Sequence, residues 1–226
     1  MRAVRGAFPN HEVPVPELFG WRQFGGKNFI YMSLIAGKTL REAWPTLTEV
    51  DKKSIQDDLK RTIVTLRQVT HGPLDPFIGS VSRGPTLDRF FRDGYFEGPL
   101  ATIQSFNDWF LAAATRTKPG PDDPTRLLRH ELYRDLLPDT GRICFTHADL
   151  TLSNIIISGE LDSQRIAGII DWEQAVWYPE YWEYCKLHFG VAENHEWLTA
   201  GWPDKVTEPF EDAFLAFGEY HNWHVL

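Results

Sequence analysis

Three short apolar runs in the second half of the chain constrain its fold most. They are "RICF", "IIIS" and "RIAGII", rich in β-branched residues, and the last two are separated only by the turn-forming stretch "GELDSQ". Runs of this length and composition, bounded by turn residues, predict strands, and the last two predict a β-hairpin. Between the first run and the hairpin lies the stretch "THADLTLSN", residues 146–154, called the polar loop below. A short turn would connect two strands more simply, so this loop is a candidate for function.

The chemistry-bearing residues of this region lie at the two ends of the predicted hairpin. Asp149 and Asn154 precede it, and Asp171 follows its second strand. Because an antiparallel hairpin returns its second strand beside its first, we expect Asn154 and Asp171 to lie at the same end. A carboxylate and an amide oxygen suit Mg²⁺, which keeps several waters and is shared with phosphate groups. Asp149 is then placed to accept a proton from a hydroxyl nucleophile.

Each of these residues also has a purely structural interpretation. Asp171 could be a turn-forming residue that closes a strand, and an isolated His-x-Asp pair is usually a surface feature or a satisfied core histidine. We interpret His147 as a structural brace and assign it no chemistry. The eight-residue spacing, together with a second Asp after the hairpin, favours the functional interpretation.

The remainder of the chain predicts a small β portion followed by a mainly helical body. "HEVPVPELFGW" is an extended connector because of its prolines, and "RQFGGK", with Gly25 and Gly26, predicts a hairpin turn between two strands. Apolar periodicity and breaker residues predict helices at 48–69, 87–91, 106–115 and 125–137, and a helical segment from 177 to 226 interrupted at Pro203 and Pro209. The fold class is therefore α+β.

Composition excludes several classes of protein. The 226 residues, 42% of them apolar, can build one large or two small cores. With 23 basic and 31 acidic side chains the net charge is −8, which argues against a nucleic-acid partner. The longest apolar stretch, "FIYMSLIAG", is too short to span a bilayer, so no membrane partner is expected. Cys144 and Cys185 have no partner at metal-ligand spacing, and a reduced, cytoplasmic chain is predicted.

The quoted motifs resemble those of a known family. "HADLTLSN" is similar to the His-x-Asp-x-x-x-x-Asn catalytic loop of the protein-kinase-like fold, and "IIDWE" resembles its metal-binding Asp segment. Trp172 and Glu173, where protein kinases have Phe and Gly, resemble the aminoglycoside phosphotransferase and choline kinase branch. "VPVPELFGW", "FIYMSLIAGKTL", "FIGSV" and "WYPEYWEYCK" are similar to fungal members of that family. The loop departs from the family's common form at four positions, where it has Ala148 for Gly, Thr151 for His, Leu152 for Pro and Ser153 for Gly.

The resemblance implies a fold, an activity and a set of site residues. It implies a protein-kinase-like fold, with residues 1–35 as a small β-containing N-lobe remnant and inter-lobe linker, and 36–226 as a larger, mainly helical C-lobe that carries the catalytic-loop hairpin. It implies transfer of a phosphoryl group from ATP to the hydroxyl of a small molecule, with Asp149 catalytic and Asn154 and Asp171 as Mg²⁺ ligands. Backbone groups of Ser33, Leu34 and Ile35 would bind adenine.

Two function classes stay open at this stage. The family normally begins with a glycine-containing phosphate loop and a strand lysine, and neither can be placed here, so we expect an N-terminally truncated member. The chain is either a small-molecule phosphotransferase or a non-catalytic kinase-like binding module from a shortened gene product. The carboxylates after Asp171 have two interpretations as well: a site for a cationic acceptor, or a solvated helix face. They are Glu173, Glu180 and Glu183.

Overall fold

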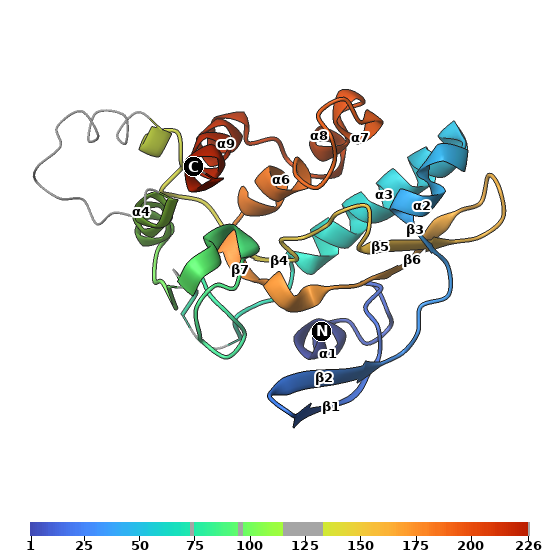
Figure 1. Ribbon diagram of the computed structural model, residues 1–226, viewed down its shortest axis with the longest axis horizontal. Coiled ribbons are helices and arrows are strands. Elements are labelled where there is room, and N and C mark those ends of the chain that lie inside the picture. The colour runs from blue at the N-terminus through green and yellow to red at the C-terminus, as the bar shows by residue number, and fades with distance from the viewer. Residues whose placement is uncertain (73–74, 95–96, 115–132, 226) are drawn as a thin grey trace, which may run out of the picture. The chain divides into compact units, whose positions relative to one another are not determined.

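A computed structural model of the chain describes residues 1–72, 75–94, 97–114 and 133–225 (Figure 1). These residues form an α+β protein with small antiparallel sheets and several helices. No helix in the described ranges is long and apolar enough to cross a membrane. The chain divides into two compact units, each built from three segments. The first unit is Met1–Val69, Asp149–Trp172 and Phe189–Thr207, and the second is Thr70–Ala148, Glu173–His188 and Glu208–Leu226.

The first unit holds both predicted hairpins. Its β1 and β2 pair antiparallel, and a three-stranded sheet has the order β3-β5-β6 (Figure 1). The elements are α1 (Arg2–Ala7), β1 (Leu18–Phe24), β2 (Lys27–Met32), β3 (Lys38–Thr39), α2 (Leu40–Ala43), the 3₁₀ turn η1 (Trp44–Thr46), α3 (Glu49–Leu66), β5 (Ile155–Ser158), β6 (Arg165–Ile169), α7 (Glu196–Thr199) and α8 (Trp202–Val206). A 3₁₀ turn, η3 (Trp172–Gln174), follows β6.

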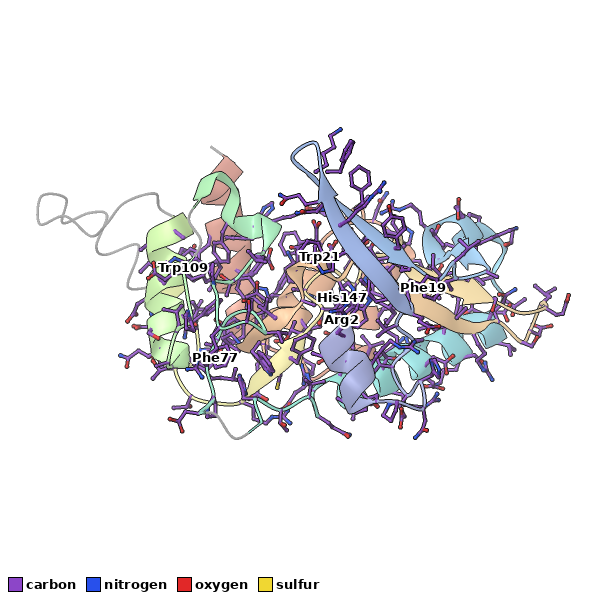
Figure 2. All side chains as sticks on the ribbon, turned by 90° about the horizontal axis from the view of Figure 1, so that it is seen from below. Arg2, Phe19, Trp21, Phe77, Trp109 and His147 are labelled. Atoms are coloured by element: carbon purple, nitrogen blue, oxygen red, sulfur yellow. The ribbon has the colours of Figure 1, made fainter. Side chains whose placement is uncertain are left out.

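The β1–β2 hairpin forms where the sequence predicts it. Gly25 and Gly26 have φ of 57° and 72°, and this left-handed pair gives the two-residue turn the twist that matches the strands. The two strands are largely exposed; Phe19 and Trp21, for example, are 67% and 64% exposed and project from the hairpin (Figure 2).

Helix α3 is the predicted amphipathic helix. It begins at a capping box in which the Thr48 hydroxyl accepts from the Asp51 N–H and the Asp51 carboxylate accepts from the Thr48 N–H. Its apolar face is buried and packs against β6 and α8. The buried apolar residues of this face are Ile55, Leu59, Ile63 and Leu66. Helix α3 thereby supports the strand that leads to Asp171.

The predicted hairpin after the polar loop is also confirmed. Strands β5 and β6 pair antiparallel, with Ile155 opposite Ile169 and Ser158 opposite Arg165. Most of β5 is buried, as its continuous apolar run predicts. The register places the start of β5 next to the end of β6, which is the arrangement that the argument about Asn154 and Asp171 requires.

The second unit is built around aromatic side chains. The ring of Trp182 stacks on Tyr178 at 5.0 Å and meets Phe106, Phe110 and Phe217 edge-on at 5.0–5.2 Å. Its described elements are η2 (Arg89–Gly94), α4 (Ile103–Ala114), β4 (Ile143–Thr146), β7 (Val176–Pro179), α6 (Trp182–Leu187) and α9 (Glu211–Val225). Aromatic burial of this kind stabilises a core, so these rings form no open cation cage.

Several expected helix boundaries are wrong. The segment from 177 begins as a strand, because "VWYP" pairs antiparallel with β4 along its whole length. Pro203 lies in the first turn of α8, where a missing N–H costs nothing, rather than breaking a helix. The segment expected at 87–91 is the 3₁₀ turn η2, and α4 begins at Ile103 rather than at 106. Most of the helix expected at 125–137, and the end of the one expected at 106–115, lie outside the described residues.

Candidate functional site

Two tight turns give the polar loop its shape. The Thr151 N–H donates to the Asp149 carbonyl at 2.8 Å, and the Asn154 N–H donates to the Thr151 carbonyl at 3.0 Å. These turns bring Asn154 back to Asp149, five residues earlier. The Asn154 side-chain amide donates to the Asp149 carbonyl and to its carboxylate Oδ2, both at 2.9 Å. The structure therefore brings these two predicted site residues into direct contact.

Asn154 also connects the loop to the end of β6. Its backbone carbonyl accepts the N–H of Ile170 at 2.9 Å, which extends the β5–β6 ladder by one bond. Asp171 comes directly after Ile170 and has φ of 62°. Asp tolerates this left-handed conformation better than most residues, but the position is strained, and such strain is concentrated at turns and functional sites. Both interpretations of Asp171, as a turn residue and as a site residue, agree with this backbone.

Asn154 and Asp171 carry oxygen atoms of the kind that bind a hard cation. Both hydrogens of the Asn154 amide are directed at Asp149, so the Asn154 Oδ1 oxygen is the atom left to face another group. Amide and carboxylate oxygens are the ligand type that Mg²⁺ prefers, and the ion commonly completes its shell with waters and phosphate oxygens. No cluster of three or more His, Cys, Asp or Glu side chains suited to a metal occurs in the described part of the chain.

The predicted inter-lobe linker, residues 33–35, lies against β6. The Ser33 N–H donates to the Glu17 carbonyl at 2.8 Å, and the Ser33 hydroxyl accepts from the Glu17 N–H at 2.9 Å. Ile35 packs so closely on β6 that a Cβ on Gly168 would come within 2.8 Å of its side chain. Leu34 is 94% exposed between them. The backbone groups of Leu34 and Ile35 make no hydrogen bond with other described residues, so they can pair with a ligand.

The residues before Asp149 belong to the second unit, and a buried carboxylate holds them. Glu183, 2% exposed on α6, accepts the N–H of His147 at 2.8 Å and that of Ala148 at 3.4 Å through Oε2. Ala148 has φ of 63° and is fully buried. His147 is fully buried too, in agreement with a structural role. Glu183 therefore fixes the backbone that leads into the loop.

The acidic residues after Asp171 do not share one role. Glu173 is exposed and forms an ion pair with Arg89, and Glu180 accepts the Arg142 Nε at 2.7 Å and its backbone N–H at 3.0 Å. Glu183 is buried, so it belongs neither to a solvated helix face nor to an open site for a cation. All three carboxylates are already engaged by the chain itself.

Sequence reasoning named Glu183 but not its role in holding the loop, and it missed Arg41 altogether. A signal for Glu183 was present, because a carboxylate inside the aromatic run "YWEYC" must be buried and therefore needs hydrogen-bond donors. Arg41 has no comparable signal. It lies more than one hundred residues before the loop, and only the folded chain places it next to Ser153.

Comparison with protein families gives a match over the whole chain. The profile described as "Phosphotransferase enzyme family" matches the chain over residues 1–226. None of the curated proteins matches it significantly.

Proposed function

The chain belongs to the phosphotransferase enzyme family, and we propose that it transfers a phosphoryl group from ATP, with Mg²⁺, to the hydroxyl of a small-molecule acceptor. The family implies a protein-kinase-like fold, and the α+β architecture is compatible with it. Within that fold we assign residues 1–35 to the small lobe and inter-lobe linker, and 36–226 to the larger lobe. The acceptor is a small molecule rather than a nucleic acid.

One observation carries the proposal. The Asn154 side-chain amide binds Asp149, while the Asn154 carbonyl binds the residue before Asp171. A single asparagine therefore couples the candidate base to the strand end that presents the candidate metal ligand.

The roles of the residues follow from this geometry. Asp149 accepts the proton of the acceptor hydroxyl. At the same time the hydroxyl oxygen forms a bond to the γ-phosphorus, and the bond between the γ-phosphorus and the ADP oxygen breaks. Asn154 keeps the Asp149 carboxylate in one orientation by donating to Oδ2. Asn154 Oδ1 and Asp171 would hold Mg²⁺, which when bound neutralises phosphate charge. Carbonyl and N–H groups of Leu34 and Ile35, with the Ser33 carbonyl, would pair with the adenine edge.

The test is a rate measurement on the purified chain. We expect Asp149→Asn to lower the Mg²⁺-dependent consumption of ATP, measured with a panel of hydroxyl acceptors and with water, by about 10²–10⁴-fold. The matched control is Asp57→Asn, which changes an exposed carboxylate on α3 and should leave the rate unchanged. Equal rates for the Asp149 variant and the wild type at saturating Mg²⁺ would remove Asp149 from the mechanism.

A second measurement tests the metal ligands separately. If Asn154 and Asp171 hold Mg²⁺, then Asn154→Ala and Asp171→Asn should each weaken binding of Mg-ATP in isothermal titration, whereas Asp149→Asn should not. Binding of Mg-ATP by the wild type without any Asp149-dependent turnover would favour the alternative, a kinase-like binding module.

A further inference from the structure

Arg41, on α2 in the first unit, makes three hydrogen bonds to segments that are distant in sequence. Its backbone N–H donates to the Leu152 carbonyl at 2.9 Å. Its guanidinium donates through Nε to the Ser153 hydroxyl at 2.7 Å and through Nη2 to the Gly190 carbonyl at 2.8 Å. Two of these acceptors lie in the polar loop between Asp149 and Asn154.

The third acceptor, Gly190, is itself in contact with the loop. Gly190 has φ of 88°, and a Cβ at this position would come within 2.8 Å of the Thr151 side chain. The 189–191 segment therefore packs directly on the loop, and the Arg41 guanidinium bridges the two. The planar guanidinium has donors in a rigid fork, so it fixes the relative position of two acceptors in a way that a single point charge cannot.

The bonds of Arg41 fall on the part of the loop that the local turns leave least constrained. The turns bond Asp149 to Thr151 and Thr151 to Asn154, but they leave the Leu152 carbonyl and the Ser153 side chain to other partners. Arg41 binds both. Since Ser153 directly precedes Asn154, a change at this point alters the direction of the Asn154 amide and, through it, the orientation of the Asp149 carboxylate.

We propose that Arg41 is a positioning residue for phosphoryl transfer, which acts through the Ser153 hydroxyl to hold Asn154 and Asp149 in their reactive arrangement. The effect of Arg41 on the rate rests on the proposed function. Its effect on the structure of the loop rests on the geometry alone. The proposed role predicts that loss of Arg41 lowers kcat while the KM for Mg-ATP changes little, because the bonds of Arg41 described above end on the polar loop and on Gly190.

The first experiment compares rates in a double-mutant cycle. Arg41→Gln should lower kcat for Mg-ATP consumption by about 10–100-fold, the scale on which misplacement of a reacting group acts. Ser153→Ala should lower it less, and the double variant should be no worse than Arg41→Gln, because both changes break the same bond. Arg41→Lys should recover part of the rate, since an ammonium can reach one acceptor but not hold two in a fixed geometry.

The control is Arg61→Gln, which changes an exposed arginine on α3 that pairs with Asp58 in the first unit. It should leave kcat, KM and the thermal unfolding midpoint unchanged. If Arg41→Gln lowers the midpoint and kcat together, and Arg41→Lys restores the midpoint fully but kcat only in part, the positioning role is separated from a merely structural one. Equal, additive losses in the cycle would overturn the inference.

Hydrogen exchange tests the loop independently of any activity. The amides of Thr151 and Asn154 close the two turns, and we expect Arg41→Gln to speed their exchange by about tenfold, with no change in α3. If the wild type consumes no ATP in an Asp149-dependent way, the proposed function fails, and faster exchange in Arg41→Gln still supports the role of Arg41 in the loop. Unchanged exchange overturns the inference whether or not the chain is an enzyme.

Discussion

Removal of the Glu183 carboxylate should unfold the entrance to the polar loop and destabilise the protein. Glu183→Ala leaves the buried N–H groups of His147 and Ala148 without their shared acceptor. A buried donor without a partner costs about 1–3 kcal/mol, so the two together cost roughly 2–6 kcal/mol. This is a large part of the usual stability of a domain, about 5–15 kcal/mol.

The charge of Glu183 contributes separately from its shape. Glu183→Gln keeps an oxygen that can accept the two N–H groups but removes the negative charge. Bonds to a charged acceptor contribute about 1.5–3 kcal/mol and neutral ones about 0.5–1.5 kcal/mol. We therefore expect Glu183→Gln to cost about 1–3 kcal/mol, less than Glu183→Ala, and to lower the transfer rate more than it lowers nucleotide affinity.

Urea denaturation measures both effects. With a slope of about 2–3 kcal/mol per molar urea, Glu183→Ala should lower the midpoint by roughly 0.7–3 M at an unchanged slope. Glu173→Ala is the control, because Glu173 is exposed and its ion pair with Arg89 should contribute at most about 1 kcal/mol. A midpoint for Glu183→Ala that equals that of the control would refute the role assigned to this carboxylate.

Three further predictions concern single positions. Burial raises the pKa of Asp51, but hydrogen bonds from N–H groups of the β5–β6 turn outweigh it and hold the pKa below its usual 3.8. As the pH falls, the unfolded chain therefore binds a proton at Asp51 before the folded chain does. The stability that Asp51 contributes is complete above about pH 4 and is lost as the pH falls through the lowered pKa of the folded state. Acid titration of Asp51→Asn should show a flatter acid limb than the wild type, with Asp57→Asn unchanged, and identical limbs would contradict it. Gly168→Val should displace Ile35 from β6 and weaken Mg-ATP binding about tenfold or more in titration calorimetry, and unchanged affinity would separate the linker from the nucleotide. Ala148→Gly should change the unfolding free energy by less than about 1 kcal/mol, because relief of the positive φ offsets the lost methyl, whereas Ala148→Val should cost more than about 2 kcal/mol.

The hairpins were predictable because their signals are local. Gly25 and Gly26 need only their own conformational freedom to make a two-residue turn, and the β-branched runs around "GELDSQ" pair with each other across six residues. Helix α3 follows from periodicity and a capping box that lie within one stretch of sequence. The convergence of Asn154 on the end of β6 could be inferred from the hairpin for the same reason.

Other features depend on partners that periodicity cannot identify. Residues 176–179 have a composition that suits a buried helix or a strand. Their pairing with β4, thirty or more residues earlier in the chain, decides for the strand. A proline can break a helix or lie in its first turn, and its own chemistry does not distinguish the two roles. The left-handed Gly201 before Pro203 selects the first-turn role. In each case the deciding group is outside the local pattern.

The polar loop shows how distant contacts can compensate for changes in a motif. Its entrance is held by Glu183 on α6, its middle by Arg41 on α2, and its exit by the N–H of Ile170 in the adjoining strand. Because these contacts bind mostly backbone atoms, they constrain the path of the loop, and the side chains of Leu150 and Leu152 are themselves buried. Among the contacts Ser153 is the exception, since its hydroxyl is a partner of Arg41. The loop can therefore depart from the family's common form at 148 and 151–153 and still deliver Asp149 and Asn154 to one place, provided that the three distant anchors are kept.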